Sequence, residues 1–191
     1  MIIGITGGSG SGKTTLLKLL QEKGALIMDC DRIYHGLLQT DTAMLQALQT
    51  RFPQAFEAGA LQRKKLGEQV FSDPEALKDL NAITHSAVKQ AVMERLKEEP
   101  ALAVIDAIAL HEGGLAQLCD LTVAVTATEE NRVKRLMTRD GISERYARSR
   151  IQAQKSNEAF SATCDHTLEN NGTQQEFTDK CLAFCHKIGI I

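Results

Sequence analysis

The stretch IIGITGGSGSGKTT, residues 2–15, decides the fold. It joins a short apolar run, Ile2–Thr6, to a glycine-rich loop that matches the pattern G-x-x-x-x-G-K-[ST], and a leucine-rich segment follows the loop. Glycines let the backbone turn tightly and direct successive N–H groups inward, where they can surround phosphate oxygens. The helix expected after the loop adds the positive end of its dipole. The stretch therefore predicts a strand, a phosphate-binding loop and a helix in direct succession.

Two residues at the end of this loop have a defined chemical role. In this pattern Lys13 reaches the β- and γ-phosphates of a nucleoside triphosphate, and the hydroxyl of Thr14 coordinates Mg²⁺. A chance match is expected in on the order of one chain in a hundred of this size, and the flanking strand and helix make it rarer still. The residues expected to contact the nucleotide in this loop are Gly8, Ser9, Gly10, Ser11, Gly12, Lys13, Thr14 and Thr15.

Length and composition describe an ordinary globular protein. The chain has 191 residues, 43% of them hydrophobic, which is enough for the buried core of one domain. Its 22 basic and 24 acidic residues leave a net charge of −2, which argues against a general nucleic-acid-binding protein. No apolar run approaches the roughly 20 residues that span a bilayer, and the N-terminus lacks the basic region and cleavage site of a signal peptide. We therefore expect neither a nucleic-acid partner nor a membrane partner.

The five cysteines are odd in number and scattered. This usage fits a reducing compartment better than a disulfide framework, and it predicts a cytoplasmic protein. Cys181 and Cys185 lie one helical turn apart beside His186. They form either part of a metal site or two apolar thiols on a buried helix face, and the strong tendency of cysteine to be buried favours the thiols.

Apolar runs alternate with helical segments along the chain. Residues 33–98 have an almost wholly helical pattern, with breaks near 40–42, 53–59 and 72–74. Strands separated by helices predict a parallel sheet that is covered on both faces. The expected strands are Ile2–Thr6, Ala25–Met28, Leu102–Ile105, Leu121–Thr126 and His166–Glu169, and the expected helices around them include Thr14–Lys23, Glu129–Arg139 and Gln174–Lys187.

Carboxylates stand at the ends of two expected strands. Asp29 and Asp31 follow the second strand, and Asp106 follows the third. Ligands of open α/β sheets lie at the carboxyl ends of the strands, where a carboxylate can accept a proton from an incoming hydroxyl or stand near Mg²⁺. Asp31 can instead cap a helix, an alternative that its closeness to the phosphate loop disfavours. For Asp106, a role near magnesium and a capping or turn role stay equally open.

Basic residues are concentrated after the fourth expected strand. Arg132, Arg135 and Arg139 share one helix face by their spacing. With the following helix they predict a mobile lid over residues 139–160, which excludes water and brings guanidinium charge to the transferring phosphoryl group. Arg139, at a break between two helices, is the main candidate for that contact, whereas Arg145 and Arg148 fit a solvated charged face better.

Motifs along nearly the whole chain resemble those of the dephospho-CoA kinases, which transfer the terminal phosphate of ATP to the 3′-hydroxyl of dephospho-CoA. The most specific are the D-x-D of MDCDRIYH, the segment R-x-x-L-x-x-x-V-F-x-D-P-x-x-x-x-x-L-N-x-x-x-H and the R-D of the lid, in that order. IIGITGGSGSGKTT, VIDAIALHEGGL, AQKSNEAF and CDHTLENNG match as well. The chain departs from the family pattern at Ile108–His111, Ser86, Asn157 and Phe160, which concerns the acceptor pocket and the lid contacts.

The resemblance implies the architecture and the catalytic groups. We expect one three-layer α/β domain of the P-loop NTPase fold over residues 1–191, with a five-stranded parallel sheet, a helical acceptor-binding insert over residues 33–100 and the lid. We expect ATP and Mg²⁺ as cofactors, with Thr14 and Asp106 near the metal. The resemblance implies that Asp31 is the base acting on the 3′-hydroxyl and that Arg139 contacts ATP phosphates, so that the catalytic residues are Asp31, Lys13 and Arg139.

The resemblance also assigns residues to the two substrates. Asn171 and Gly172 lie near the expected adenine end of ATP, although Asn-Gly equally suits a plain strand-to-helix turn. His85 without the resemblance is interpreted as a capping or core histidine. His111 beside Glu112 allows a metal or acid–base interpretation, but a packed loop pair is favoured. The residues expected to bind the acceptor are Asp29, Asp31, Arg63, His85, Asp106 and Glu112.

Two other function classes compete with this interpretation. One is a kinase of another small hydroxylated acceptor, such as a nucleoside or nucleotide, which differs in the acceptor region. The other is a non-catalytic nucleotide-binding module, which has no use for an acceptor base or a lid arginine. GTP is disfavoured because the sequence lacks an N-K-x-D segment that reads guanine. We expect a monomer or a weak homo-oligomer whose partner is the small-molecule acceptor dephospho-CoA.

Overall fold

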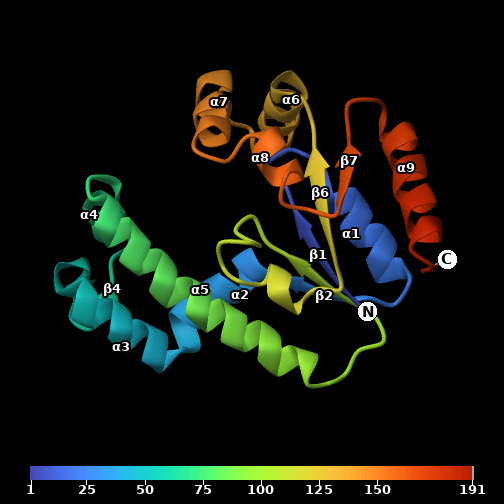
Figure 1. The fold of residues 1–191 in the computed structure, drawn as a ribbon. Coiled ribbons are helices and arrows are strands. Elements are labelled where there is room, and N and C mark those ends of the chain that lie inside the picture. The colour runs from blue at the N-terminus through green and yellow to red at the C-terminus, as the bar shows by residue number, and fades with distance from the viewer. Residues whose placement is uncertain (191) are drawn as a thin grey trace. The chain divides into compact units, whose positions relative to one another are not determined.

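The computed structural model describes residues 1–190 (Figure 1). The chain consists of two compact units. The first unit comprises residues 1–28, 99–111 and the described residues from 115 onward. The second comprises residues 29–98 and 112–114, and it covers most of the segment that the sequence assigns to the insert. The assignment of the chain to one kinase domain, with its insert at 33–100 and its lid at 139–160, stays a prediction.

A five-stranded sheet runs through the first unit in the order β2-β5-β1-β6-β7. Central strand β1 pairs in parallel with β5 on one side and with β6 on the other, and β6 pairs in parallel with β7. The parallel sheet is confirmed, and each strand lies within one residue of its expected bounds, because strands buried on both faces read as continuous apolar runs. The strands are β1 (Ile2–Thr6), β2 (Leu26–Asp29), β5 (Ala103–Asp106), β6 (Leu121–Thr126) and β7 (His166–Glu169).

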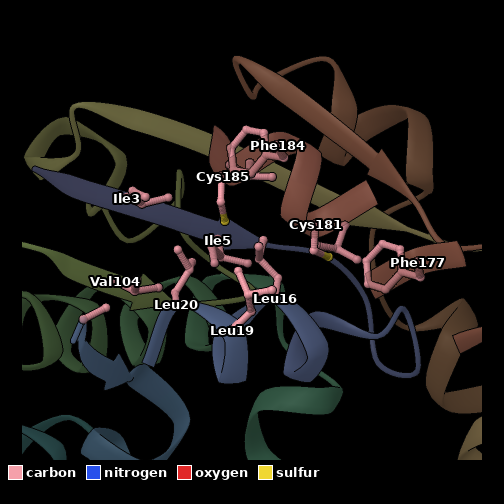
Figure 2. Close-up of a cluster of buried hydrophobic side chains, with 13 residues drawn as sticks. Ile3, Ile5, Leu16, Leu19, Leu20, Val104, Phe177, Cys181, Phe184 and Cys185 are labelled. Carbon is pink, nitrogen blue, oxygen red and sulfur yellow. The ribbon is translucent and has the colours of Figure 1, made fainter. Parts of the chain in front are cut away.

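Helices α1 (Lys13–Glu22) and α9 (Gln174–Lys187) cover one face of the sheet. Figure 2 shows their apolar side chains packed around Ile3 and Ile5 of β1. Cys181 and Cys185 of α9 are 0% exposed within this cluster, which confirms their interpretation as apolar thiols of a buried helix face. The cluster fixes the start of α1, and therefore the loop before it, against the centre of the sheet.

The opposite face of β6 is also covered. Strand residues alternate between faces, and Thr122, Ala124 and Thr126 are all buried although they point away from the cluster around α1 and α9. Helix α8 (Asn157–Ser161) contacts β6 on this side, and Phe160 is 3% exposed. A 3₁₀ helix, η2 (Ala116–Leu118), leads into β6.

Helices α6 (Glu129–Asp140) and α7 (Glu144–Gln152) follow β6, and the predicted lid, residues 139–160, begins at the end of α6 and includes α7 (Figure 1). They pack on one another through a small cluster of their own, made by Val133, Leu136, Ala147 and Ile151. Both helices begin at a capping side chain. Thr128 and Ser143 accept hydrogen bonds from the first turns of α6 and α7, and Gly141 ends α6 in the left-handed conformation that favours glycine.

The second unit has its own core. The buried residues at its centre include Met44, Leu48, Phe52, Leu66 and Val70. Among residues 1–190, no helix combines the length and apolar character needed to cross a membrane, although α5 has 23 residues. The helices of this unit are α2 (Cys30–Thr40), α3 (Thr42–Arg51), η1 (Pro53–Ala55), α4 (Arg63–Phe71) and α5 (Pro74–Leu96).

A short antiparallel hairpin interrupts these helices where the sequence predicts only a break. Strands β3 (Phe56–Glu57) and β4 (Ala60–Leu61) pair with Phe56 opposite Leu61. The turn between them is formed by Ala58 and Gly59, both with positive φ. Alanine rarely adopts that conformation, and the turn lacks the Asn-Gly or Asp-Gly pair that usually identifies a hairpin.

Candidate functional site: a phosphate loop held by a lid helix

The glycine-rich loop follows β1 and is pressed against other parts of the first unit. Gly12 has φ +102°, and a Cβ at this position would lie 2.0 Å from Nδ2 of Asn170. Glycine is therefore required at residue 12 by both its backbone conformation and its close neighbour. Gly12 is also the N-cap residue of α1, and it provides no side-chain hydrogen bond to the helix.

The N-terminus of α1 is open to an anion. Its first turn contains no acidic residue and no side-chain cap, whereas Asp29, Thr128 and Thr173 cap the helices that follow them. The unsatisfied N–H groups of a helix start carry partial positive charge and attract phosphate. This absence of a cap matches the predicted function of the loop.

The lysine and threonines of the loop lie at the start of α1. Nζ of Lys13 donates a hydrogen bond of 2.8 Å to the carbonyl oxygen of Gly7, so the ammonium group lies over the loop. Thr14 is exposed. The hydroxyl of Thr15 accepts a 2.9 Å hydrogen bond from Nε2 of Gln174 in α9. Lys13 and Thr14 are therefore positioned beside the loop as predicted, and their roles stay predictions.

Two arginines of α6 bind the carbonyl groups of this loop. Arg132 is 3% exposed, and its Nε donates to the carbonyl oxygen of Ser9 at 2.9 Å. Arg135 donates through NH1 to the carbonyl oxygens of Gly10 and Ser11, each at 3.2 Å. Burial lowers the pKa of both guanidinium groups, but arginine stays charged at any physiological pH. Two positive charges are thus fixed next to the predicted phosphate site.

Asn170, directly after β7, completes the support of the loop. It is 4% exposed, and its Nδ2 donates to the carbonyl oxygen of Ser11 at 2.9 Å. Its Oδ1 accepts from NH2 of Arg135 at 3.0 Å. The predicted residue Asn171 is exposed and points elsewhere, because its Oδ1 accepts from the backbone N–H of Thr128 at 2.8 Å. Gly172 follows it directly.

Arg139, the predicted phosphate ligand of the lid, forms an ion pair inside the lid. Its Nε lies 2.6 Å from Oδ1 of Asp140, and its side chain is 60% exposed. Arg150 lies 2.8 Å from the other oxygen of the same carboxylate. Hydrogen bonds from Arg139, supported by those from Arg150, lower the pKa of Asp140 to about 2. The structure does not bring Arg139 to the loop, so its phosphate contact stays a prediction.

The outer arginines of the lid behave as a charged surface. Arg145 is exposed. Arg148 forms ion pairs with Glu129 at 2.7 Å and with Glu144 at 2.8 Å. Both placements agree with the solvated face expected from the sequence.

Asp106 ends β5 at the same edge of the sheet as the phosphate loop. It stands in register with Ile5 of β1, two residues before the loop begins. The carboxyl ends of neighbouring parallel strands meet at one edge, so this carboxylate is at the correct end for a ligand. Its role near Mg²⁺ stays a prediction.

The remaining predicted residues belong to the second unit. Oδ1 of Asp29 accepts a 2.9 Å hydrogen bond from the N–H of Arg32 and caps α2, so the capping role considered for Asp31 belongs to Asp29. Asp31 is exposed in the first turn of α2. Arg63 is the first residue of α4. Burial raises the pKa of Tyr34, and the positive charge of Arg63 partly offsets this effect. Their contacts with an acceptor stay predictions.

His85 and Glu112 complete the predicted set, and His111 is the neighbour of Glu112 for which a packed loop pair is favoured. His85 lies in the middle of α5, and this position excludes a helix-capping role. Its side chain is half-buried, and burial lowers its pKa. Glu112 is exposed. His111, in the first unit, has its Nε2 3.6 Å from Sγ of Cys164, and burial lowers its pKa.

Comparisons with known proteins identify the family. A family model described as dephospho-CoA kinase matches residues 1–176. The chain belongs to the dephospho-CoA kinase family. A dephospho-CoA kinase of Syntrophotalea carbinolica is 33% identical over 98% of this chain and 92% of its own length. Among solved structures, a protein from Thermus thermophilus superposes with a TM-score of 0.83 at 34% identity, covering 98% of this chain and 96% of that chain. A dephospho-CoA kinase from Campylobacter jejuni has a TM-score of 0.67 at 25% identity, with the same coverage.

Sequence reasoning about this dephospho-CoA kinase family member missed part of the support around the loop. The i, i+3 spacing correctly placed Arg132 and Arg135 on one helix face, but it did not reveal that this face binds loop carbonyls. Gln154 also contacts the loop, through Ser9. Asn170 carried no local signal that distinguishes it from Asn171, because its partners are 35 and 159 positions away in the chain.

Proposed function

We propose that this chain transfers the γ-phosphate of ATP to the 3′-hydroxyl of dephospho-CoA, which yields coenzyme A. The observation that carries the proposal is the glycine loop before the uncapped start of α1, with two guanidinium groups against it, in a chain whose match to the family extends over residues 1–176. An uncapped helix start and adjacent cations favour a polyphosphate. The family match supports the acceptor and the reaction.

The chemistry requires positioning and charge stabilisation rather than a covalent intermediate. Phosphoryl transfer passes through a loose transition state with charge spread over the phosphate oxygens. We assign Lys13 and the N–H groups of residues 8–15 to the β- and γ-phosphates, and Asn171 with Gly172 to the adenine end. Asp31 is assigned as the base that accepts the proton of the 3′-hydroxyl as the oxygen attacks phosphorus.

Thr14 and Asp106 are the residues that we assign to Mg²⁺. Both provide the oxygen donors that this ion prefers, and Thr14 is exposed. When bound, the ion neutralises charge on the phosphate oxygens.

Arg139 is assigned to the phosphates of ATP, which requires an exchange of partners. Its guanidinium group is engaged by Asp140, so a phosphate must compete with a carboxylate for the same donors. Arg150 contacts the other oxygen of Asp140 and can keep that carboxylate paired when Arg139 leaves. Exposed ion pairs contribute only about 0–1 kcal/mol, so a polyphosphate with its higher charge can win this competition.

The acceptor is assigned to residues 33–100, with Arg63 and His85, and to Asp29 and Glu112. A cationic side chain and a histidine suit the phosphate and adenine groups of dephospho-CoA. A cytoplasmic location and a monomer or weak homo-oligomer belong to the same proposal.

The test is an acceptor panel with purified protein, ATP and Mg²⁺. ADP release is measured with dephospho-CoA, with nucleosides and with nucleoside monophosphates. We expect rapid turnover with dephospho-CoA alone. Turnover with a nucleoside and none with dephospho-CoA would favour the competing kinase, and ATP binding without turnover on any acceptor would favour a regulatory module.

A further inference from the structure

Ser9 of the phosphate loop is bound at three of its atoms by two side chains, Arg132 of α6 and Gln154 after α7. Its carbonyl oxygen accepts from Nε of Arg132 at 2.9 Å, and its N–H donates to Oε1 of Gln154 at 2.9 Å. Its hydroxyl accepts from Nε2 of Gln154 at 2.8 Å. NH2 of Arg132 donates to the same Oε1 at 2.9 Å, which closes the arrangement into a ring. We call Arg132 and Gln154, with these four bonds, the Ser9 network.

The two members come from separate parts of the α6–α7 pair. Arg132 belongs to the first turns of α6, and Gln154 follows the end of α7. The Ser9 network therefore joins both ends of the α6–α7 pair to a loop that is 123 and 145 positions away in the chain. A shift of either helix changes the position of Ser9.

Arg132 is a buried cation whose hydrogen-bond acceptors in the described part of the chain carry no charge. The group is 3% exposed, yet its hydrogen-bond acceptors among residues 1–190 are a peptide carbonyl and an amide oxygen, both neutral. Glu129 acts on it only through a longer-range attraction. A buried cation without a hydrogen-bonded carboxylate is unfavourable by itself. An anion in the adjacent loop would supply the missing opposite charge.

The loop is in direct contact with this guanidinium group. A Cβ at Gly8 would lie 2.1 Å from NH2 of Arg132 and 3.0 Å from Oε1 of Gln154. Glycine at residue 8 therefore lets the backbone approach the Ser9 network closely. A glycine-rich loop without such contacts has many conformations. The conformational entropy lost on ordering it would then weaken nucleotide binding.

We propose that Arg132 and Gln154 are positioning residues, which hold the Ser9 peptide and so keep the phosphate loop in its nucleotide-binding conformation before ATP arrives. The inference rests on the proposed function only in that the loop binds ATP; it is independent of which acceptor is phosphorylated. The α6–α7 pair thereby acts on donor affinity through the start of α6 and the end of α7.

The test measures the affinity of variants for the ATP analogue AMP-PNP with Mg²⁺ by calorimetry. Gln154→Leu removes three of the four bonds and Arg132→Met removes two, and we expect the Kd to rise on the order of tenfold or more in each. Because the two side chains act as one unit, the double variant should be only slightly weaker than the worse single variant. The KM for ATP should rise while the KM for dephospho-CoA stays unchanged.

Matched controls come from the same helices. Gln152→Leu removes an exposed glutamine at the end of α7, and Arg148→Met removes an arginine paired at the surface, so neither should change the Kd. Ser9→Ala deletes only the hydroxyl contact and should raise the Kd roughly two- to threefold, the effect expected from the loss of one weak hydrogen bond. This smaller change still tests the proposal if the larger variants do not fold.

Distinct results separate the possible failures. The positioning role of Arg132 and Gln154 is refuted if the folded Gln154→Leu and Arg132→Met proteins bind AMP-PNP with the wild-type Kd. If those two variants do not fold, a wild-type Kd for Ser9→Ala refutes it. Additive losses in the double variant would likewise contradict action as one unit. Failure of the wild-type protein to phosphorylate dephospho-CoA, with nucleotide affinity still dependent on the Ser9 network, would refute the proposed function and leave the positioning role intact.

Discussion

Asn170→Ala should destabilise the protein more than any other single change at an asparagine of this region. The side chain is 4% exposed and bonds on one side to the carbonyl oxygen of Ser11 and on the other to NH2 of Arg135. A neutral hydrogen bond contributes about 0.5–1.5 kcal/mol and one to a charged group about 1.5–3 kcal/mol. Alanine keeps the backbone bond of residue 170 to Thr126 but loses both side-chain bonds.

The expected decrease in the free energy of unfolding is therefore about 2–4.5 kcal/mol. For a chain of this length that corresponds to a drop in Tm of roughly 4–18 °C. The measurement is urea unfolding followed by circular dichroism, with a thermal melt as a second readout. ATP affinity should fall as well, because Arg135 and the carbonyl of Ser11 lose a shared partner.

Asn171→Ala is the matched control for this prediction. That asparagine is exposed and accepts one hydrogen bond from the N–H of Thr128, which water can replace. Its unfolding free energy should stay within about 1 kcal/mol of wild type. If Asn170→Ala changes stability by less than about 0.5 kcal/mol, or less than Asn171→Ala does, the account of the loop support is wrong.

Three further predictions address charge, catalysis and packing. The pKa of Asp140 lies at about 2, below its ordinary value of 3.8, so its ion pairs stabilise the protein above pH 4 and this stabilisation is lost as pH falls toward 2. Asp140→Asn should remove this component of acid unfolding and free Arg139 from its ion pair. Thermal melts over a series of pH values measure the effect. Lys13→Ala and Asp31→Asn should each lower kcat by orders of magnitude with an unchanged Tm, and a near-normal kcat for Asp31→Asn would remove that residue from the role of base. Phe177→Ala should lower the free energy of unfolding by about 3–5 kcal/mol, since Phe177 is 1% exposed in the main core, and a loss below 1 kcal/mol in urea unfolding would contradict that placement.

The sequence was sufficient for features that depend on local patterns. The five strands are continuous apolar runs because both faces of the sheet are covered. The hairpin at 56–61 was not predictable in this way, since Ala58 adopts a positive φ that its residue type does not favour.

The support of the phosphate loop was harder to predict because it depends on distant partners. Arg132 and Arg139 have the same chemistry and the same helix face, yet one binds Ser9 and the other pairs with its neighbour Asp140. Only the packing of α6 against the loop separates them. Spacing along a helix identifies which residues share a face, but not what that face contacts.

The central claim concerns the position of the phosphate on the product. Purified protein is incubated with ATP, Mg²⁺ and dephospho-CoA, and the product is analysed by mass spectrometry and phosphorus nuclear magnetic resonance. The account predicts one added phosphoryl group, as a monoester on the 3′-oxygen of the ribose. A product phosphorylated at another position, or unaltered dephospho-CoA in the presence of bound ATP, would contradict it.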